Sequence, residues 1–478
     1  MLIQGAEIAG ERLDLRCAAG RIGEIGRDLA PRAGEPCHAA AGGALLPGLH
    51  DHHLHLFSLA ASLTSIPCGP PQIENADALA RALREATPSD GWLRGTGYFE
   101  SVAGPLDRAR LDALSGDTPL RIQHRSGVLW FLNSAAIRAL SLDDPTRAAR
   151  TSALPEIERD ARGRATGRLF RADGWLRERL PRTQPPDLRA AARTLARFGV
   201  TSLTDATASN DRSQAALFRA AQRNGDLPQR LQLMGDASLA ELASDPRLAV
   251  GPRKFLLDEP ALPDLDALIA EVARTHAAGR GCAFHCVTRV ELHFALCALE
   301  AAGARPSDRI EHASVAPHEA IERVKQLGIR VVTQPNFGFE RGDDYLREVE
   351  ARDQPDLYRV RAWLEAGVPL TAGTDAPYGD ADPWRAMRAA VTRRTRRGAL
   401  LGEDERISPE AALALFAPDA IAGIAAGIAV GQPADLCLLD APWREVREAL
   451  SSERVAATFC AGERVYSREP GPGASNFT

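Results

Sequence analysis

Eight short apolar runs, separated by stretches of helical period, constrain the fold of this chain more than any other feature. Each run is bounded by turn residues, and the stretches between most of them are rich in Ala, Leu and Arg. This alternation is typical of βα units on a parallel sheet. The predicted strands are 48–56, 199–207, 230–236, 253–259, 282–288, 309–314, 329–336 and 368–377. Among the helices, 265–279 and 317–328 are each predicted to end at a glycine.

Eight parallel strands with intervening helices can close into a (β/α)8 TIM barrel, which we predict for residues 48–419. In such barrels the catalytic groups lie at the carboxyl ends of the strands. Several histidines of this chain fall at those ends. The predicted fold class is therefore α/β, with the functional residues at one mouth of the barrel.

Three segments depart from the regular barrel pattern. Residues 1–47 and 420–478 contain short β-like runs with glycine turns, and we predict that they form one small β-sandwich domain from both termini. Residues 62–185 separate the first two strands by far more than one crossover helix, which indicates an insertion over the mouth of the barrel. Segment 337–367 is longer than a usual connection and is a candidate for a mobile lid.

The composition excludes several classes of function. The chain has 478 residues, 45% of them hydrophobic and 25% charged, with a net charge of −5 and no basic stripe that would bind nucleic acid. No apolar run reaches the length of a membrane span. The first residues do not resemble a signal peptide, so we expect a cytoplasmic protein. Eight scattered cysteines argue against a disulfide framework.

Residues 47–56, PGLHDHHLHL, contain four of the eleven histidines. His53 and His55 are two positions apart, so on a strand their side chains point to the same face. As neutral imidazoles at the end of the first barrel strand, they are candidates to bind one metal ion together. His50 and His52 fall on the other face and are not expected to be ligands. The alternative is a polar surface cluster.

His285, in CAFHCV, and His312, in RIEHAS, lie near the ends of two successive apolar strands. Either one alone would more often be a hydrogen-bonded core residue, but two in register with the upstream His-x-His pair favour metal ligands. Asp375, in TAGTDAPYG, supplies a carboxylate at the end of the eighth strand, which neighbours the first strand when a barrel closes. An isolated TDAP would also suit a turn or a helix cap.

Lys254 is one of only two lysines among the 58 basic residues, the other being Lys325. It lies in the strand RKFLLDE, where an ammonium group inside a barrel is costly unless it is neutralised, paired or modified. A lysine amine, unlike a guanidinium, loses its proton on burial and can then add carbon dioxide to form a carbamate. The alternative is that Lys254 faces outward or pairs with Asp258 or Glu259.

The combined motifs resemble the metal-dependent amidohydrolase superfamily in kind and order. They are GGALLPGLHDHHLHL, HC on strand five, EHAS on strand six, GTDAP on strand eight and the terminal VGQPADLCLLD. The long insertion, with GWLRGTGYFES and LNSAAI, resembles the amidohydrolase 3 branch, which N-substituted formamide deformylase typifies. The resemblance covers essentially the whole chain.

The resemblance implies a divalent metal site with one or two ions, zinc being the expected metal. With two ions, the His-x-His pair and the aspartate hold the first, the histidines of strands five and six hold the second, and a carbamylated Lys254 bridges them. With one ion, His312 contacts the substrate instead. Both versions stay open. The full set of implied ligands is His53, His55, Lys254, His285, His312 and Asp375.

The implied reaction is hydrolysis of a carbon–nitrogen bond in an amide, a cyclic amide or an N-acyl compound. The metal would lower the pKa of water and polarise the carbonyl, giving a hydroxide nucleophile at neutral pH. Asp375 would take the proton of that water and pass it to the leaving nitrogen. In the one-metal version His312 would stabilise the oxyanion.

Two other functions compete with hydrolysis of an amide. A deaminase of the same superfamily commonly has a glutamate three residues after the strand-five histidine, where this chain has Thr288. A non-catalytic relative that keeps the barrel for binding or assembly would usually have lost metal ligands, whereas this chain retains the whole set. We therefore rank both below the hydrolase.

The expected partner is a small-molecule substrate, and the resemblance also allows a homodimer. The chain departs from this branch at Tyr98-Phe99, Val128 and Val287-Thr288, all where substrate would be touched, so the substrate is not identified. The candidate substrate contacts flank strand ends or lie in the insertion. They are Tyr98, Arg125, Trp130, Arg289, Asn336 and Tyr378.

Overall fold

The computed structural model describes residues 1–144, 156–180, 185–418 and 427–468. The chain forms two compact units, Met1–Leu56 with Leu188–Thr478, and Phe57–Asp187, and the second of these contains the predicted insertion. The boundary predicted at 420 falls among residues 419–426, outside the described ones. Among the described helices, none has the length and apolar character needed to cross a membrane. All eight cysteines are described, and all are free thiols.

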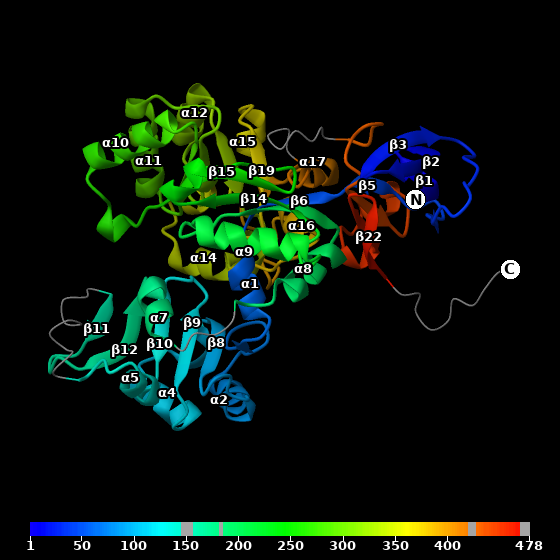
Figure 1. The fold of residues 1–478 in the computed structure, drawn as a ribbon. Helices are drawn as coiled ribbons and strands as arrows, with labels where there is room; N and C mark the ends of the chain where they lie inside the picture. The colour runs from blue at the N-terminus through cyan, green and yellow to red at the C-terminus, as the bar shows by residue number, and fades with distance from the viewer. Residues whose placement is uncertain (145–155, 181–184, 419–426, 469–478) are drawn as a thin grey trace. The chain divides into compact units, whose positions relative to one another are not determined.

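An eight-stranded parallel sheet forms the barrel of the first unit and confirms the predicted (β/α)8 fold. Each strand overlaps one of the predicted runs, and helices lie outside the sheet (Figure 1). The strands are β6 (Leu49–Leu54), β13 (Val200–Asp205), β14 (Arg230–Gly235), β15 (Leu248–Leu256), β16 (Cys282–Cys286), β17 (Arg309–His312), β18 (Arg330–Thr333) and β19 (Leu370–Ala372). The helices of this unit include α8 (Leu188–Arg197), α9 (Arg212–Arg223), α10 (Leu265–Ala277), α11 (Arg289–Ala302), α12 (His318–Leu327), α15 (Arg361–Glu365), α16 (Pro383–Thr392) and α17 (Pro409–Ala414).

The two end strands of this sheet, β6 and β19, meet at a seam that closes the barrel. The backbone N–H of Asp375 donates to the carbonyl of His53 at 2.7 Å, and the N–H of His55 donates to the carbonyl of Ala376 at 2.8 Å. These two bonds tie the residues just after β19 to the end of β6. The seam therefore brings the histidine pair beside Asp375, which follows β19 in the chain.

Asp51 and Gly373 explain how the two strands come so close. The buried carboxylate of Asp51 accepts from the N–H of Thr374 at 3.0 Å and from its hydroxyl at 2.5 Å. Gly373 provides the space, because a Cβ there would lie 2.4 Å from the backbone nitrogen of His53. Asp51, in HDHHLH, thus belongs to the closure of the barrel.

The two termini build a β-sandwich, as predicted, from two four-stranded sheets with the orders β3-β2-β1-β4 and β22-β21-β20-β5. Its core combines residues from both ends of the chain, including Ile3, Leu15, Leu436 and Phe459. Its strands are β1 (Leu2–Ile8), β2 (Glu11–Ala18), β3 (Arg21–Gly26), β4 (Cys37–Ala39), β5 (Leu45–Pro47), β20 (Leu436–Leu439), β21 (Val455–Cys460) and β22 (Glu463–Ser467), with one short helix, α18 (Trp443–Val446).

The second unit contains a six-stranded sheet of order β11-β12-β10-β9-β8-β7. Alternate residues of its strands pack into two hydrophobic cores: Ile122 and Phe131 belong to one, and Trp130 and Leu132 belong to the other. The strands are β7 (Ile66–Pro67), β8 (Leu93–Tyr98), β9 (Leu120–His124), β10 (Leu129–Leu132), β11 (Ile157–Arg159) and β12 (Ala165–Phe170). The helices among the described residues of this unit are α2 (Ala76–Glu85), α3 (Glu100–Ala103), α4 (Arg108–Ser115), α5 (Ser134–Ala139) and α7 (Asp173–Arg179); α1 (Leu56–Ser62) leads into this unit from β6.

The segment after β18, which the sequence made a candidate lid, carries α13 (Asn336–Glu340), α14 (Gly342–Glu348) and α15. It has a small hydrophobic core, in which Phe337, Leu357 and Tyr358 pack with Val315 and Leu401. This part of the chain is therefore built as packed helical structure.

We expect Gly373→Ala to destabilise the protein, since the new methyl group would overlap the backbone of His53 and push the seam apart. Overpacking of this kind costs about 1–3 kcal/mol in the free energy of unfolding. Urea unfolding followed by circular dichroism measures the loss.

Gly174→Ala is the matched control, because a Cβ at this helical glycine meets nothing within 4 Å. This control should be neutral or slightly stabilising. Equal free energies of unfolding for the wild type and Gly373→Ala would show that the seam tolerates a side chain.

Candidate metal centre

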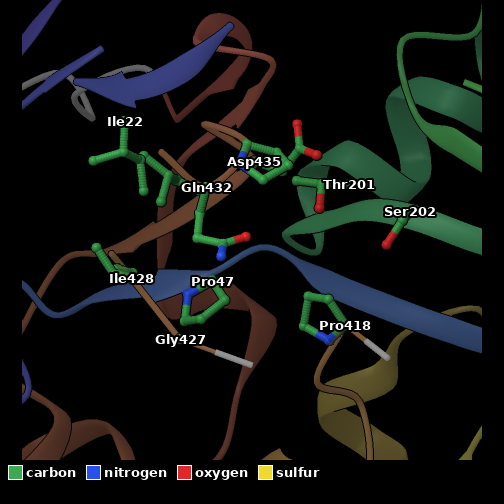
Figure 2. A pocket seen from close by; sticks show the side chains of 11 residues that line it. Ile22, Pro47, Thr201, Ser202, Pro418, Gly427, Ile428, Gln432 and Asp435 are labelled. Carbon is green, nitrogen blue, oxygen red and sulfur yellow. The ribbon is translucent and has the colours of Figure 1, made fainter. Parts of the chain in front are cut away.

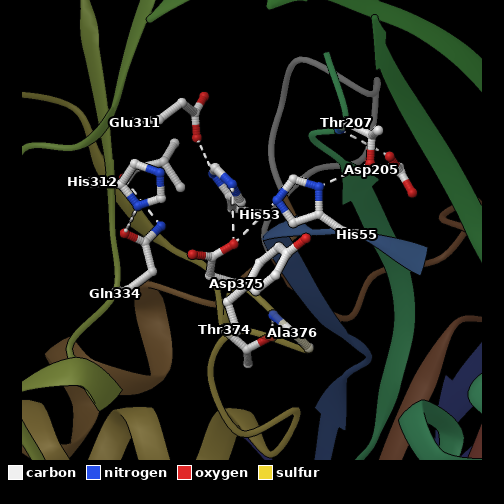
Figure 3. A network of polar contacts seen from close by, with 12 residues as sticks. His53, His55, Asp205, Thr207, Glu311, His312, Gln334, Thr374, Asp375 and Ala376 are labelled. Carbon is white, nitrogen blue, oxygen red and sulfur yellow. Dashed lines mark hydrogen bonds and ion pairs between the residues drawn. The ribbon is translucent and has the colours of Figure 1, made fainter. Parts of the chain in front are cut away.

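His53 and His55 both face Asp375 at the end of β6, as Figure 3 shows. Their Nε2 atoms lie 3.5 Å and 3.2 Å from the Oδ1 atom of Asp375. Burial lowers the pKa of His53 to about 4, so its imidazole is neutral at pH 7. A neutral imidazole offers a lone pair, which is the form that binds a metal ion.

His50 and His52 turn away from Asp375 and are held by other groups. The ring of His50 lies between the hydroxyls of Ser202 and Thr204, at 2.9 Å from each. The Nε2 atom of His52 lies 3.0 Å from the carbonyl oxygen of Ala417. Both rings are buried within the first unit and use their nitrogens there.

His312 and Asp375 reach the same point through an unusual backbone. Both are non-glycine residues with positive φ, 69° and 57°, which is the left-handed region. Such conformations are found where the surrounding structure holds them, often at functional sites. One potential ligand atom from each of His53, His312 and Asp375 lies within 4.8 Å of the others.

His285 lies on β16, which pairs with β17, and Lys254 lies on β15, the next strand of the sheet. The ring centroid of His285, on β16, is 4.4 Å from that of His312. Lys254, on β15, is only 6% exposed, which excludes the alternative that it faces outward. Burial lowers its pKa to about 8, although the nearby charge of Glu311 opposes this shift. The structure thus directs Lys254 into the protein, as the carbamate hypothesis requires.

The protonation of His312 follows from its contact with Gln334. The Nδ1 atom of His312 lies 2.7 Å from the Oε1 atom of Gln334, whose Nε2 donates to the carbonyl of Val332. Because that carbonyl can only accept, the amide oxygen faces the ring and His312 carries its proton on Nδ1. Burial also lowers the pKa of His312 to about 3. Its Nε2 atom therefore carries a lone pair.

Three buried polar atoms at this point have no hydrogen-bond partner among the described residues: Nζ of Lys254, Nε2 of His312 and Oδ1 of Asp375. Buried polar atoms in native proteins are usually paired, so three together call for a ligand. Imidazole nitrogens and a carboxylate oxygen are the donors that zinc and similar cations bind. These residues fit a divalent cation, and we refer to His53, His55, Lys254, His285, His312 and Asp375 as the candidate metal site.

Several residues of this network were missed in the sequence. Glu311, Gln334 and Thr207 contact the Nδ1 atoms of His53, His312 and His55 respectively. No spacing rule identifies Gln334 or Thr207, because both come from other strands. Glu311 stands in the EHAS motif, but strict strand alternation would place it on the face opposite to His312.

A second group of potential ligands, His276, Cys282 and Asp308, lies at the start of β16 and β17, opposite the strand ends of the candidate site. Here the groups satisfy one another. Oδ1 of Asp308 lies 2.9 Å from Nε2 of His276 and accepts from the N–H of Cys282 at 2.7 Å, and Oδ2 accepts from the N–H of Arg305 at 2.7 Å. This group serves as an internal tie between strands and a helix.

A small cavity lies near the junction of the barrel and the sandwich, apart from the candidate metal site (Figure 2). Its lining includes Pro47, Thr201 and Asp435 but no residue of the candidate metal site. Its volume of about 10 Å³ is the space of a single water molecule. This cavity is too small for a substrate.

Three of the six predicted substrate contacts lie in the barrel unit. The ring of Tyr378 stands 5.3 Å from that of His55, and Nδ2 of the buried Asn336 donates to the carbonyl of Thr374 at 2.9 Å. Both are therefore neighbours of the candidate metal site. Arg289 binds Asp353 and Asp356, at 2.6 and 3.1 Å, and so ties the start of α11 to the segment after β18. These ion pairs account for the position of the Arg289 side chain, so no contact with a substrate is needed to explain it.

The other three lie in the unit Phe57–Asp187. Tyr98 is fully buried, and its hydroxyl donates to the carbonyl of Gly104. The Nε1 atom of Trp130 donates to Asp173 at 3.0 Å, and the guanidinium of Arg125 stacks on the ring of Phe99 at 3.2 Å from its centre. Tyr98 thus takes part in the core of this unit.

Comparisons with known proteins identify the family of the chain and similar folds. Residues 38–466 match the amidohydrolase family. An N-substituted formamide deformylase from Arthrobacter pascens is 25% identical, with 94% of each chain covered. An uncharacterised metal-dependent hydrolase from Pyrococcus horikoshii has a similar structure, with a TM-score of 0.72, 20% identity and coverage of 92% of this chain and 97% of that chain. An atrazine chlorohydrolase from Arthrobacter aurescens, solved with zinc, gives a TM-score of 0.56 at 15% identity, with 99% and 97% covered.

We expect acid to destabilise the metal-free protein between about pH 6.5 and pH 4. The pKa values of about 4 for His53 and about 3 for His312 lie below the ordinary value of 6.5. In this range the unfolded chain binds protons that the folded chain does not, so the free energy of unfolding falls as the pH falls. Asp51 has the opposite effect on the free energy of unfolding. Burial raises its pKa to about 7, so in this range the folded chain binds one proton at Asp51 that the unfolded chain does not.

Urea unfolding of chelator-treated protein at stepped pH measures this dependence. His53→Gln removes one of the groups, so its free energy of unfolding should change less steeply with pH. An unchanged slope in this variant would contradict the protonation state given to His53.

Proposed function

The chain belongs to the amidohydrolase family, as its motifs indicated, and from this premise we propose that it is a metal-dependent hydrolase of carbon–nitrogen bonds. The substrate would be an amide, a cyclic amide or an N-acyl compound. One observation carries the proposal: unpartnered atoms of Lys254, His312 and Asp375 are buried together beside the His53-His55 pair. The deformylase named above, which is similar over nearly the whole chain, supports the choice of bond.

A divalent cation at the candidate metal site would supply Lewis acidity, which acidifies water and polarises a carbonyl group. Zinc is the metal we propose, since it suits these donors and is the ion in the solved atrazine chlorohydrolase. Asp375 would transfer protons during the reaction. Burial opposes its ionisation, but its contacts with His55 and His53 outweigh burial and hold its pKa below the usual range. Its carboxylate oxygen would take a proton from the attacking water and deliver it to the leaving nitrogen.

His312 suits the role of ligand better than that of oxyanion donor. A donor to the oxyanion needs a proton on Nε2, whereas the contact with Gln334 puts the proton of His312 on Nδ1. This favours the version in which two ions are bound, with His285 and His312 on the second. Lys254 would then bridge the ions as a carbamate, for which its burial and its lowered pKa are suitable.

Deamination remains the second candidate, because it needs the same barrel and the same histidines. Thr288 stands where such enzymes commonly carry a glutamate, and here its hydroxyl caps α11 by accepting from the N–H of Glu291 at 3.1 Å. A proton shuttle from this position is therefore not available. A purely binding role ranks lower, since the chain retains the whole set of implied metal ligands. The cytoplasmic location and the homodimer stay predictions.

We propose that Asn336 and Tyr378 border the substrate, because both lie next to residues of the candidate metal site. A role in substrate binding has less support for the other four predicted contacts, because their polar or charged groups already contact other residues of the protein. These four are Tyr98, Arg125, Trp130 and Arg289.

The function is tested with a panel of amides, lactams, hydantoin-like rings and N-acyl amino acids. We expect the protein as purified to contain metal and to release an amine from at least one class, a chelator to abolish this, and Zn²⁺ to restore it. Asp375→Asn should retain most of the metal and lose turnover by about 10²–10⁴-fold, the usual contribution of proton transfer.

Asp380→Asn is the control, because this aspartate binds Arg385 at 2.6 Å at the edge of the same loop. It should keep near-normal turnover. Release of ammonia from aminated heterocycles in place of amide cleavage would favour the deaminase, and full activity of Asp375→Asn would remove the role given to Asp375.

The bridge is tested by Lys254→Ala. We expect this variant to bind less metal and to lose activity, with partial rescue by a short carboxylic acid such as propionate, which can replace the carbamate. The matched control is Lys325→Ala, since Lys325 is the only other lysine and is exposed on α12. Unchanged metal content in Lys254→Ala would show that this lysine does not bridge.

A further inference from the structure

A buried ion pair lies under the candidate metal site. Arg309 and Glu311 are two positions apart on β17, so their side chains share one face of the strand. The Nε atom of Arg309 contacts Oε1 of Glu311, and its Nη2 atom lies 3.1 Å from Oε2. Glu311 is fully buried and Arg309 is 5% exposed. A carboxylate held in this way by a guanidinium is ionised and accepts hydrogen bonds only.

The pair bridges β17 to β6. The Nη2 atom of Arg309 donates to the carbonyl of His52 at 2.7 Å, and Oε2 of Glu311 contacts Nδ1 of His53 (Figure 3). Strand β17 thus places two successive residues beside the His53 ring. Glu311 contacts its Nδ1 atom, and the ring centroid of His312 is 4.8 Å from that of His53. The left-handed backbone of His312 allows both side chains to reach it.

The contact with Glu311 determines which nitrogen of His53 carries the proton. Because the carboxylate only accepts, the hydrogen lies on Nδ1, and the neutral ring keeps a lone pair on Nε2. That Nε2 atom faces Oδ1 of Asp375 at 3.5 Å, and the same oxygen lies 3.2 Å from Nε2 of His55. Two acceptors facing each other at this distance suit a cation between them.

Within the candidate metal site, His312 and His55 also have a defined Nδ1 contact, and their partners are neutral. His312 meets the amide of Gln334, at 2.7 Å, and His55 meets the hydroxyl of Thr207, at 2.8 Å. His53 alone among these three has a charged partner. A carboxylate behind a ligating histidine both fixes the ring and raises the basicity of the ligating nitrogen.

We infer that Glu311, held by Arg309, is the positioning residue for the metal: it keeps His53 in the Nδ1–H form and directs Nε2 at the ion. This inference rests on the proposed metal-dependent function. In Glu311→Gln the donors of Arg309 would take the amide oxygen, so the amide NH₂ would face His53. The proton of His53 would then move to Nε2 and block the ligating atom.

The experiment uses the full-length protein, stripped of metal with a chelator. Zn²⁺ titration should show binding about tenfold to a hundredfold weaker in Glu311→Gln than in the wild type, the usual effect of losing such a partner. Nitrogen-15 NMR of histidine-labelled, metal-free protein should show the Nδ1–H form of His53 in the wild type, assigned with His53→Gln, and the Nε2–H form in Glu311→Gln.

Asp308→Asn is the matched control, because Asp308 also forms a buried contact with a histidine, His276, at 2.9 Å, and the other partners of its carboxylate, Cys282 and Arg305, lie outside the candidate metal site. It should bind Zn²⁺ as the wild type does. Equal weakening in both variants would indicate a general loss of structure and overturn the inference. So would wild-type affinity in Glu311→Gln.

The wild-type spectrum tests the inference without any variant, which covers the case that Glu311→Gln does not fold. An Nε2–H form of His53 in the metal-free wild type overturns it. A wild type that binds no metal overturns the proposed function together with this inference, whereas a wild type that binds Zn²⁺ beside an unaffected Glu311→Gln overturns only the role of Glu311.

Discussion

Closure of the barrel between β6 and β19 is the constraint on which the candidate metal site depends. His53 and His55 stand at one end of the sheet in its strand order and Asp375 follows the strand at the other end, so they meet only if the sheet curls back on itself. Two backbone hydrogen bonds, the Asp51 carboxylate and the missing side chain of Gly373 hold the two edges together. The residues that close the fold and those that assemble the site are thus immediate neighbours.

The second constraint is electrostatic. A group of imidazoles and carboxylates shielded from water is unfavourable unless each charge has a partner and each proton a defined place. Arg309 compensates Glu311, and the carboxylate in turn orders His53, while Gln334 orders His312. The buried atoms that have no hydrogen-bond partner among the described residues include Nζ of Lys254, Nε2 of His312 and Oδ1 of Asp375. The polar groups around the site therefore have partners, and the atoms at its centre are those that we propose bind a cation.

Membership of the amidohydrolase family and the geometry of the site support the same chemistry by independent routes. The family match covers residues 38–466, and the structural matches at 15% and 20% identity show the fold. The geometry adds what such matches do not supply, namely which nitrogen of His312 bears a proton and which side chains face inward. Substrate choice depends on neighbours of the site such as Tyr378 and Asn336, and these do not identify one compound by themselves.

The sequence by itself determined the barrel, the terminal β-sandwich and the main candidates for metal binding. Strand and helix periods are local properties, and His53, His55 and His312 stand at strand ends that those periods locate. The tertiary structure alone decided how the histidines are protonated and held. The histidine rings are held by contacts with residues of other strands, and such contacts have no fixed spacing in the chain. The contacting residues are Gln334, Thr207 and Glu311. The tertiary structure also decided that Glu311 and His312 face the same ring. The left-handed backbone at His312 breaks the alternation on which a strand pattern relies, and a histidine at this position does not by itself predict that conformation.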